Sequence, residues 1–221
     1  RLPLKGASDS SLRLGGGGMR AASSSTVSVL GAASRVIAGC VIAPEVEAAP
    51  SINDRIQQRI PGAFVRAIGA NVGFGAAANE VLRLVEGDNG FFLICHDDVA
   101  PEPGALRLMV EELYRSNAGA VGPKLVDWDN PSVLQAVGLG MDRFGEIDPV
   151  VEPGEVDQEQ HDGVRDVFVL PSAYLLVRAD LFRELDGFDP AIDFYGEDTE
   201  LCWRIHHSGA RVVVVPSARV R

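Results

Sequence analysis

The 221-residue sequence is poor in cysteine, aromatic side chains and positive charge. Its three cysteines, Cys40, Cys95 and Cys202, are widely spaced and form no C-x-x-C pair, so the sequence gives no sign of a disulfide framework or a zinc knuckle. A reducing compartment fits this usage. The 20 Lys and Arg residues against 31 Asp and Glu give a formal net charge of -11. A polyanion would be repelled by such a chain, which excludes nucleic acid as a partner.

The sequence also lacks a long hydrophobic run. No stretch of about 18 apolar residues is present, so this segment does not span a bilayer by itself, and peripheral membrane association stays open. We expect a cytoplasmic protein, with the inner face of the plasma membrane as an alternative address.

One stretch complicates this address. From Met19 a basic start and an apolar run lead to Ile37-Ala38-Gly39-Cys40, which resembles a bacterial lipoprotein cleavage site. Arg35 interrupts the apolar run, which favours a buried strand and turn that happen to end in Cys40. The sequence alone does not decide between a lipoprotein site at Cys40 and a strand that ends there.

The composition indicates one folded domain preceded by an unstructured segment. Residues 1–25 are rich in Gly and Ser, include a four-glycine run and show no sustained period, so they are predicted to be disordered. In residues 26–221, short apolar segments alternate with amphipathic stretches, as expected for an α/β fold with a mostly parallel central sheet flanked by helices.

The periodicity places the individual elements. Strands are predicted over 26–30, 63–68, 91–95, 118–127, 166–178 (kinked at Pro171 or split in two) and 210–216. Helices are predicted over 76–86, 103–117, 179–185 and 198–207. The acidic stretch 127–165 has no clear period and is predicted to be a functional loop or a small hairpin excursion.

The predicted strand FFLIC runs directly into His96, Asp97 and Asp98. Adjacent carboxylates repel each other, and in an open α/β sheet the carboxyl ends of strands border the ligand crevice. A hard cation such as Mg²⁺ or Mn²⁺ would use one or two of these carboxylates and leave the rest of its shell to substrate phosphates. An Asp-rich turn that caps the next helix explains the same residues equally well.

A second acidic cluster stands at the start of the last predicted helix. It contains Glu197, Asp198 and Glu200. A carboxylate held here could act as a general base towards a hydroxyl nucleophile, whereas simple helix capping is an equally good explanation for one cluster alone. Two such clusters in one small domain, each beside a turn, favour a functional site.

Several stretches, taken in order, carry a resemblance. They are GANVGFGAAANEVL, FFLICHDDVAPEPGAL, VGPKLVDWDNP, GEVDQEQHDGVRDV and LVRADLFRELDGFDPAIDFYGEDTELCWRIHHSGARVVVVP. As a collinear set over about residues 54–221, they resemble the family 2 glycosyltransferases of the GT-A fold, in particular the rhamnosyl- and galactofuranosyltransferases of the actinobacterial cell envelope. The resemblance implies a bacterial transferase of cell wall and polysaccharide biosynthesis.

The resemblance also implies roles for the two acidic clusters. HDDV stands where the family has its DXD-type motif, so Asp98 is implied to hold the metal, with His96 and Asp97 near the ribose and the metal. In GEDTELCWR, Asp198 is implied to be the base that deprotonates the acceptor, and Glu197 to orient it.

Further site residues come from the GANVGFGAAANEVL stretch. Asn71, Gly73, Gly75 and Asn79 match the family's turn and helix beside the nucleotide, whereas Trp203 is expected to pack. The implied reaction is a metal-assisted, inverting transfer from a nucleotide-diphosphate sugar to a hydroxyl of a glycan or polyprenyl-linked acceptor.

Two departures from the family pattern lead to an alternative. Residues 1–25 do not look like the family's first, base-binding strand, and the chain stops at Arg221 where the family commonly continues to a histidine. On this comparison the domain is expected to be partial. The alternative is a truncated or degenerate GT-A-like domain that acts as a non-catalytic binding or scaffold module.

Overall fold

The computed structural model describes residues 27–31, 37–42, 58, 64–68, 72–192 and 195–221. The strands are β1 (Val27–Gly31), β2 (Ile37–Ile42), β3 (Phe64–Ala67), β4 (Phe91–Cys95), β5 (Ala120–Val126), β6 (Leu134–Ala136), β7 (Leu139–Met141), β8 (Ile147–Pro149), β9 (Arg165–Asp166), β10 (Tyr174–Arg178) and β11 (Val212–Val220). The helices are α2 (Phe74–Ala78), α3 (Val81–Leu84), α4 (Ala105–Ser116), α5 (Ala179–Glu184) and α6 (Glu197–His207). The predicted 1–25 segment and Asn71 lie outside the described residues.

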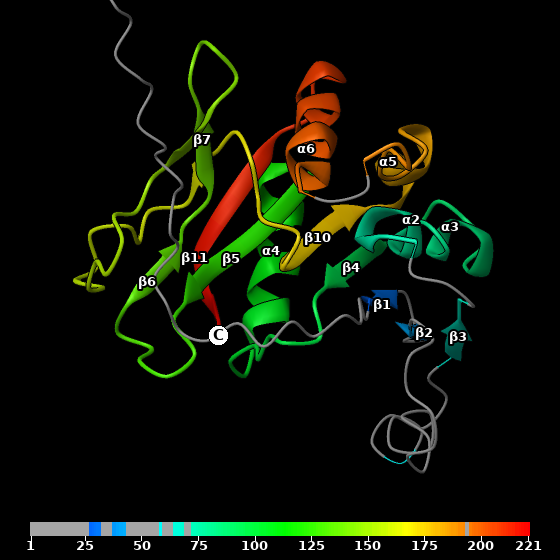
Figure 1. Cartoon of the computed structure of the whole chain (residues 1–221), viewed down its shortest axis with the longest axis horizontal. Helices are drawn as coiled ribbons and strands as arrows, with labels where there is room; N and C mark the ends of the chain where they lie inside the picture. The colour runs from blue at the N-terminus through cyan, green and yellow to red at the C-terminus, as the bar shows by residue number, and fades with distance from the viewer. Residues whose placement is uncertain (1–26, 32–36, 43–57, 59–63, 69–71, 193–194) are drawn as a thin grey trace, which may run out of the picture.

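The predicted α/β architecture is confirmed, with a central nine-stranded sheet in the order β3-β2-β1-β4-β10-β5-β11-β9 and β6 paired to β5 (Figure 1). The expectation of a mostly parallel sheet is wrong for the described strands, because only β2–β3 and β5–β11 pair in parallel. A parallel pair needs a crossover of a dozen or more residues, and only residues 32–36 separate β1 from β2. Strand β10 inserts between β4 and β5 and runs antiparallel to both.

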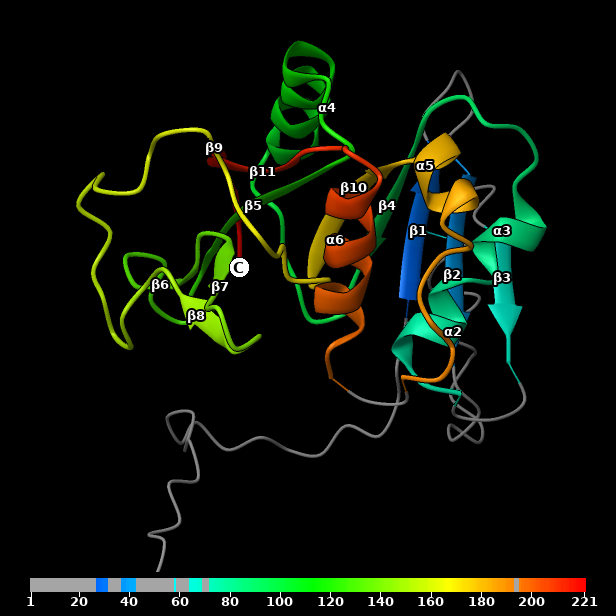
Figure 2. The same cartoon turned by 90° about the horizontal axis from the view of Figure 1, so that it is seen from above.

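Helices cover both faces of the sheet, with α4 on one face and α2, α3, α5 and α6 on the other (Figure 2). The alternating side chains of β4 divide accordingly. Phe92 and Ile94 join the core cluster that includes α5 and α6 residues, whereas Phe91 and Leu93 pack in the cluster with α4. The whole FFLIC strand is therefore buried, which explains its continuous apolar sequence.

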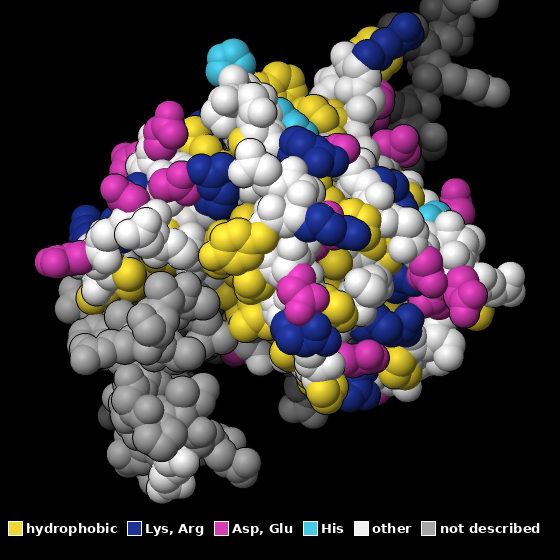
Figure 3. Space-filling model, turned by 180° about the vertical axis from the view of Figure 1, so that it is seen from behind, with side chains coloured by type: hydrophobic (Ala, Val, Ile, Leu, Met, Phe, Trp, Pro, Cys, Tyr) yellow, Lys and Arg dark blue, Asp and Glu magenta, His cyan; other side chains and the backbone are white. Residues whose placement is uncertain are grey.

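The face covered by α4 carries charges of both signs interspersed with hydrophobic side chains (Figure 3). On α4 itself Arg107 pairs with Glu111 at 2.7 Å, and Arg115 pairs with Glu112. Neither sign of charge dominates among the side chains visible there.

Two predicted elements are divided in the structure. The helix expected over 76–86 is broken into α2 and α3 around Asn79, whose side chain bonds to the backbone of Phe188. Of the two forms predicted for the 166–178 segment, a single kinked strand or two short ones, the structure contains two short strands, β9 and β10. Between them an extended piece, residues 168–172, leaves the sheet and lies against α6.

The acidic excursion between β5 and β9 contains the β7–β8 hairpin, which confirms the predicted hairpin there. A fully buried lysine anchors this excursion. Lys124 on β5 is 1% exposed, and its Nζ lies 3.0 Å from both carboxylate oxygens of Asp157 and also contacts Asp162. Arg219 donates a further hydrogen bond to Asp157. A buried charge needs such partners because desolvation penalises it when it is alone.

Cys40 lies inside β2, opposite Ser28 of β1 and Val65 of β3. Of the two alternatives for this stretch, the structure therefore contains the strand, which continues past Cys40 to Ile42. Within the part of the chain that the structure describes, no helix is both long and apolar enough to cross a membrane.

Candidate active site

The HDD motif lies where β4 ends. The backbone N–H of His96 donates to the carbonyl of Ala173 at 3.0 Å, which prolongs the β4–β10 ladder by one bond. The His96 ring meets Phe74 of α2 edge-on, with 4.6 Å between ring centroids. Asp97 and Asp98 follow at the surface, and both are exposed. The strand thus ends with two exposed carboxylates beside a histidine whose ring contacts Phe74.

The second acidic cluster begins α6. Gly196, in the left-handed region at φ +99°, precedes Glu197, so the helix starts at the predicted acidic residues. The Asp198 carboxylate accepts N–H bonds from Ser172 at 3.3 Å and from Thr199 at 2.7 Å. Negative charge at this end is favoured by the helix dipole.

The third acid of this cluster, Glu200, has a different role. Its carboxylate pairs with Arg204 one turn further along α6. Arg204 also donates to the carbonyls of Leu185 at 2.6 Å and Gly187 at 2.7 Å. Glu200 therefore belongs to a structural network that ties α6 to the turn after α5, and it leaves Glu197 and Asp198 as the candidate site acids.

Two consecutive residues join the two acidic clusters. Ser172, which is buried, donates its backbone N–H to Asp198, and the carbonyl of Ala173 accepts the N–H of His96. The two clusters thus lie on either side of one dipeptide, although about a hundred residues separate them in the sequence. No sequence signal marks Ser172, because its contribution comes from the main chain.

Helix α2 borders the same site through the turn before α6. A Cβ atom at Gly75 would lie 2.9 Å from the Cβ of Phe188 and 3.7 Å from the Cβ of Glu197, so only glycine allows this approach. Asn79 donates to the Phe188 carbonyl at 2.7 Å and accepts the Phe188 N–H at 2.8 Å. In this arrangement the Asn79 amide positions the turn, and its nucleotide role stays a prediction. Gly73, with φ +83°, directly precedes α2.

An aromatic contact links these parts. Phe74 lies between His96, at 4.6 Å, and Phe188, at 6.0 Å between centroids. Phe74 and Phe188 did not appear among the predicted site residues. Their flanking glycines in GFG and GFDP were the available signal, since glycine often marks a close backbone approach.

Residues 168–172 run along α6 with one contact at each helical turn. The Phe168 carbonyl lies 3.0 Å from His206 Nε2, the Leu170 N–H points to Cys202 Sγ at 3.5 Å, and Ser172 donates to Asp198. Every second residue of an extended segment meets every fourth residue of the helix. The lengths agree, since four extended residues span about 13 Å and eight helical residues about 12 Å.

A family model described as glycosyltransferase-like family 2 matches residues 23–221. The chain belongs to this family. The match covers every element described above, from β1 to β11, and both acidic clusters.

Two curated relatives of this family are enzymes of Mycobacterium tuberculosis. An N-acetylglucosaminyl-diphospho-decaprenol L-rhamnosyltransferase is 30% identical over 185 residues, which are 74% of this chain and 59% of that protein. A pre-mycofactocin glycosyltransferase is 29% identical over 150 residues, 66% of this chain and 29% of that protein. The chain thus spans little more than half the length of the first relative.

Solved structures share the GT-A fold at low sequence identity. A structure of GalNAc-T7 with UDP, GalNAc and Mn²⁺ matches with a TM-score of 0.63 at 12% identity, over 81% of this chain and 36% of that one. A mannosyltransferase from Pyrobaculum calidifontis with GDP-Man and Mn²⁺ matches with a TM-score of 0.53 at 18% identity, over 81% and 46%. At these identities the likeness concerns the fold alone.

The exposed carboxylates at the end of β4 can be compared with the known kinds of metal site. Among the residues with described positions, no group of three or more His, Cys, Asp and Glu side chains forms a ready-made cluster. Asp97 and Asp98 are adjacent, exposed and oxygen-bearing. Such a pair suits Mg²⁺ or Mn²⁺ that completes its shell with phosphate oxygens, and it does not suit a closed zinc site.

Proposed function

We propose that this domain transfers a sugar from a nucleotide-diphosphate donor to a hydroxyl group of a cell-envelope glycan or lipid-linked acceptor, with inversion at the anomeric carbon. The observation that carries the proposal is the Ser172–Ala173 dipeptide, whose main chain bonds both to the Asp198 carboxylate and to the N–H of His96, the first residue of the HDD motif. Family membership supports it, as does the relative whose acceptor is a polyprenyl diphosphate carrying N-acetylglucosamine.

The donor side is assigned to β4 and α2. Asp98, with Asp97 beside it, would hold a divalent cation, and His96 would face the ribose. When bound, the cation neutralises charge on the diphosphate leaving group. The N-terminal turn of α2, with Gly73 and Gly75, would border the nucleotide because the glycines allow a close backbone approach.

The acceptor side is assigned to the start of α6. Asp198 would take the proton of the acceptor hydroxyl as its oxygen forms a bond to the anomeric carbon and the bond to the diphosphate breaks. The N–H groups of Ser172 and Thr199 fix the carboxylate's orientation. Glu197, on the preceding residue, would orient the acceptor. A positioned base of this type contributes about 10²–10⁴-fold to the rate.

A donor-binding titration tests the proposal. Isothermal titration of UDP, GDP and dTDP, each with and without Mn²⁺, should give metal-dependent binding of one nucleotide. No metal-dependent binding of any of the three would overturn the transferase assignment. Metal-dependent binding together with no transfer to any polyprenyl-linked or glycan acceptor would instead favour the alternative, a binding module that retains the fold without turnover.

We also propose that the reaction takes place at the inner face of the plasma membrane, where a polyprenyl-linked acceptor would be embedded. The protein would then associate peripherally. Co-sedimentation with vesicles that contain a polyprenyl diphosphate sugar, compared with vesicles without it, should show retention only in the first case.

A further inference from the structure

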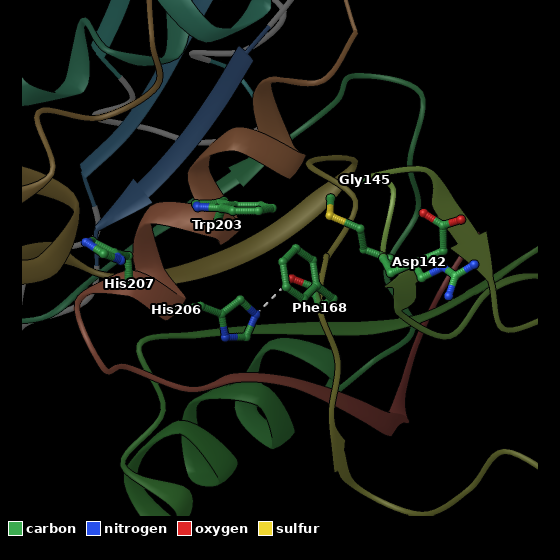
Figure 4. A pocket seen from close by; sticks show the side chains of 8 residues that line it. Asp142, Gly145, Phe168, Trp203, His206 and His207 are labelled. Atoms are coloured by element: carbon green, nitrogen blue, oxygen red, sulfur yellow. Dashed lines mark hydrogen bonds between the residues drawn. The ribbon is translucent and has the colours of Figure 1, made fainter.

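A pocket of about 470 Å³ lies between α6 and the β7–β8 hairpin, some two helical turns from Asp198 (Figure 4). Its lining includes Asp142 and Arg143 of the hairpin, Phe168, and Trp203 and His206 of α6. None of these residues was predicted to bind a ligand.

We propose that this pocket binds a saccharide unit of the acceptor, remote from the hydroxyl that reacts. The proposal rests on the proposed function for its biological role, whereas the binding of a saccharide can be measured independently of it.

The aromatic side chains of the pocket suit a sugar ring. Trp203 is 54% exposed although it is the largest side chain of α6, and its indole meets Phe168 edge-on at 5.7 Å between centroids. The two rings together form an aromatic wall of the pocket. Pyranose rings present an apolar face of C–H groups that packs on an indole, and a pocket of aromatic side chains with a few polar groups is typical of small-molecule sites.

Two of the polar side chains, Asp142 and Arg143, come from the hairpin turn. Figure 4 shows Trp203 and Asp142 on the two sides of Phe168. Asp142 is held in place because its Oδ1 accepts the N–H groups of Phe144 at 2.7 Å and Glu146 at 2.9 Å. Arg143 lies next to it and stacks over Phe144 at 4.7 Å. A carboxylate and a guanidinium in the lining can accept from and donate to the hydroxyl groups of a sugar, whereas an alkyl chain would desolvate these charged groups without compensation.

The pocket lies on the acceptor side of the candidate active site. Both views of the fold place the β7–β8 hairpin and helix α2 on opposite sides of α6 (Figures 1 and 2). A ligand beside the hairpin therefore does not compete with a donor beside α2.

The pocket is also coupled to the proposed base by a continuous segment. His206 stacks on Phe168 at 4.9 Å and bonds its carbonyl, and four residues later Ser172 donates to Asp198. His206, which lines the pocket, and Asp198 are eight residues apart along α6, about 12 Å. The pocket thus lies on the same helix as the proposed base, at the distance expected of an acceptor unit remote from the reacting hydroxyl.

Intrinsic fluorescence gives a direct test, because the chain contains two tryptophans, Trp128 and Trp203. In a Trp128→Phe variant, Trp203 is the sole reporter. Titration with N-acetylglucosamine, N,N′-diacetylchitobiose and rhamnose, without nucleotide or metal, should give a saturable emission change with at least one of them. Hexanol serves as an apolar control ligand. The proposal would be overturned if none of the three sugars gave a saturable change, or if hexanol gave one and the sugars did not.

Variants locate the binding. Saturation-transfer NMR with the sugar that binds should show Trp203→Ala weakening it by about tenfold and Arg143→Ala weakening it as well. Trp128→Ala, which removes an equally exposed indole elsewhere, should leave binding unchanged. Equal affinity of Trp203→Ala and the parent would overturn the proposal. If the protein bound a saccharide but no nucleotide, the saccharide site would be supported and the proposed transferase function would not.

Discussion

Ser172 donates its backbone N–H to the carboxylate of Asp198 at 3.3 Å, while the next carbonyl, of Ala173, receives the N–H of His96 at 3.0 Å. The spacing between the two acidic clusters is thus set by main-chain bonds from one dipeptide. Since the Ser172 side chain takes no part in either bond, Ser172→Ala should leave the arrangement of the two clusters in place.

Replacing the proposed base should separate binding from turnover. In Asp198→Asn the amide oxygen can still accept the Ser172 N–H, so the fold and the metal-dependent nucleotide affinity should be unchanged. Turnover should fall by about 10²–10⁴-fold, because the amide cannot take a proton. Calorimetric affinity and transfer rate, measured on the same sample, check this. Undiminished turnover would show that Asp198 is not the base.

Replacing the proposed metal ligand should have the opposite effect. Asp98→Ala should abolish the Mn²⁺-dependent part of nucleotide binding, since one of two adjacent carboxylates is lost. The melting temperature should be unaffected because Asp98 is exposed. Asp129→Ala, an exposed aspartate far along the chain, is the matched control and should bind nucleotide normally. Equal metal dependence in both variants would rule out Asp98 as a ligand.

The Asn79 amide should matter for stability. Asn79→Ala removes one donor and one acceptor from the Phe188 backbone and should lower the free energy of unfolding by about 1–3 kcal/mol. Asn79→Asp keeps the acceptor but presents a carboxylate to the Phe188 carbonyl, so it should destabilise as well. Denaturant unfolding measures both, with exposed Asn89→Ala as control. Unchanged stability with a raised donor KM would instead indicate direct nucleotide contact.

The buried Lys124–Asp157 pair should make stability depend on acid pH. Burial alone would raise the pKa of Asp157, but hydrogen bonds from Lys124 and Arg219 hold the pKa below its ordinary value of 3.8. A carboxylate with a lowered folded pKa stabilises fully above its unfolded pKa, and this stabilisation is lost as the pH falls through the folded value.

Substitution of Asp157 tests this. Asp157→Ala should destabilise by up to about 3 kcal/mol at pH 7, because buried Lys124 loses one of its two carboxylate contacts and Arg219 loses a hydrogen bond. Its melting temperature should also fall less steeply between about pH 5 and pH 3 than that of the parent. Thermal unfolding across this range measures both effects, and Asp129→Asn should follow the parent curve. A parallel fall in Asp157→Ala and the parent would contradict the assignment.

Cys202 should be unreactive in the folded protein. Burial raises the pKa of its thiol to about 12. Only about one thiol in ten thousand is then ionised at pH 8, and the thiolate is the reactive form. Mass spectrometry after iodoacetamide treatment should find the Cys202 peptide unmodified in buffer and modified in guanidinium chloride. Modification of folded protein would mean that the contact between α6 and residues 168–172 opens readily.

The local sequence pattern predicted those elements whose hydrophobic residues show a clear strand or helix periodicity. The run FFLIC, the amphipathic period of 105–116 and the acidic start of α6 each predicted an element that the structure contains. The missed features depend on other segments. Asn79, at the break between α2 and α3, bonds to the backbone of Phe188 more than a hundred residues away. Strand β10 pairs antiparallel with β4 and β5, which both come much earlier in the chain.

The candidate site divides in the same way. His96, Asp97, Asp98, Glu197 and Asp198 were predicted because their side chains are visible in the sequence, and their catalytic roles stay predictions. Ser172 acts through a backbone N–H, which every non-proline residue carries, so the sequence gives it no mark. The Trp203 pocket likewise appears only when the β7–β8 hairpin folds against α6.

The sequence by itself determined the family, the main elements and the two acidic clusters, because hydrophobic periodicity and the order of motifs depend on local sequence alone. Tertiary structure alone decided how those clusters meet. Ser172 bonds to Asp198 while Ala173 bonds to the main chain of His96, and Phe168 of the same segment contacts Trp203 and His206. These relationships are main-chain bonds and packing between distant segments, and they exist only once the sheet has formed.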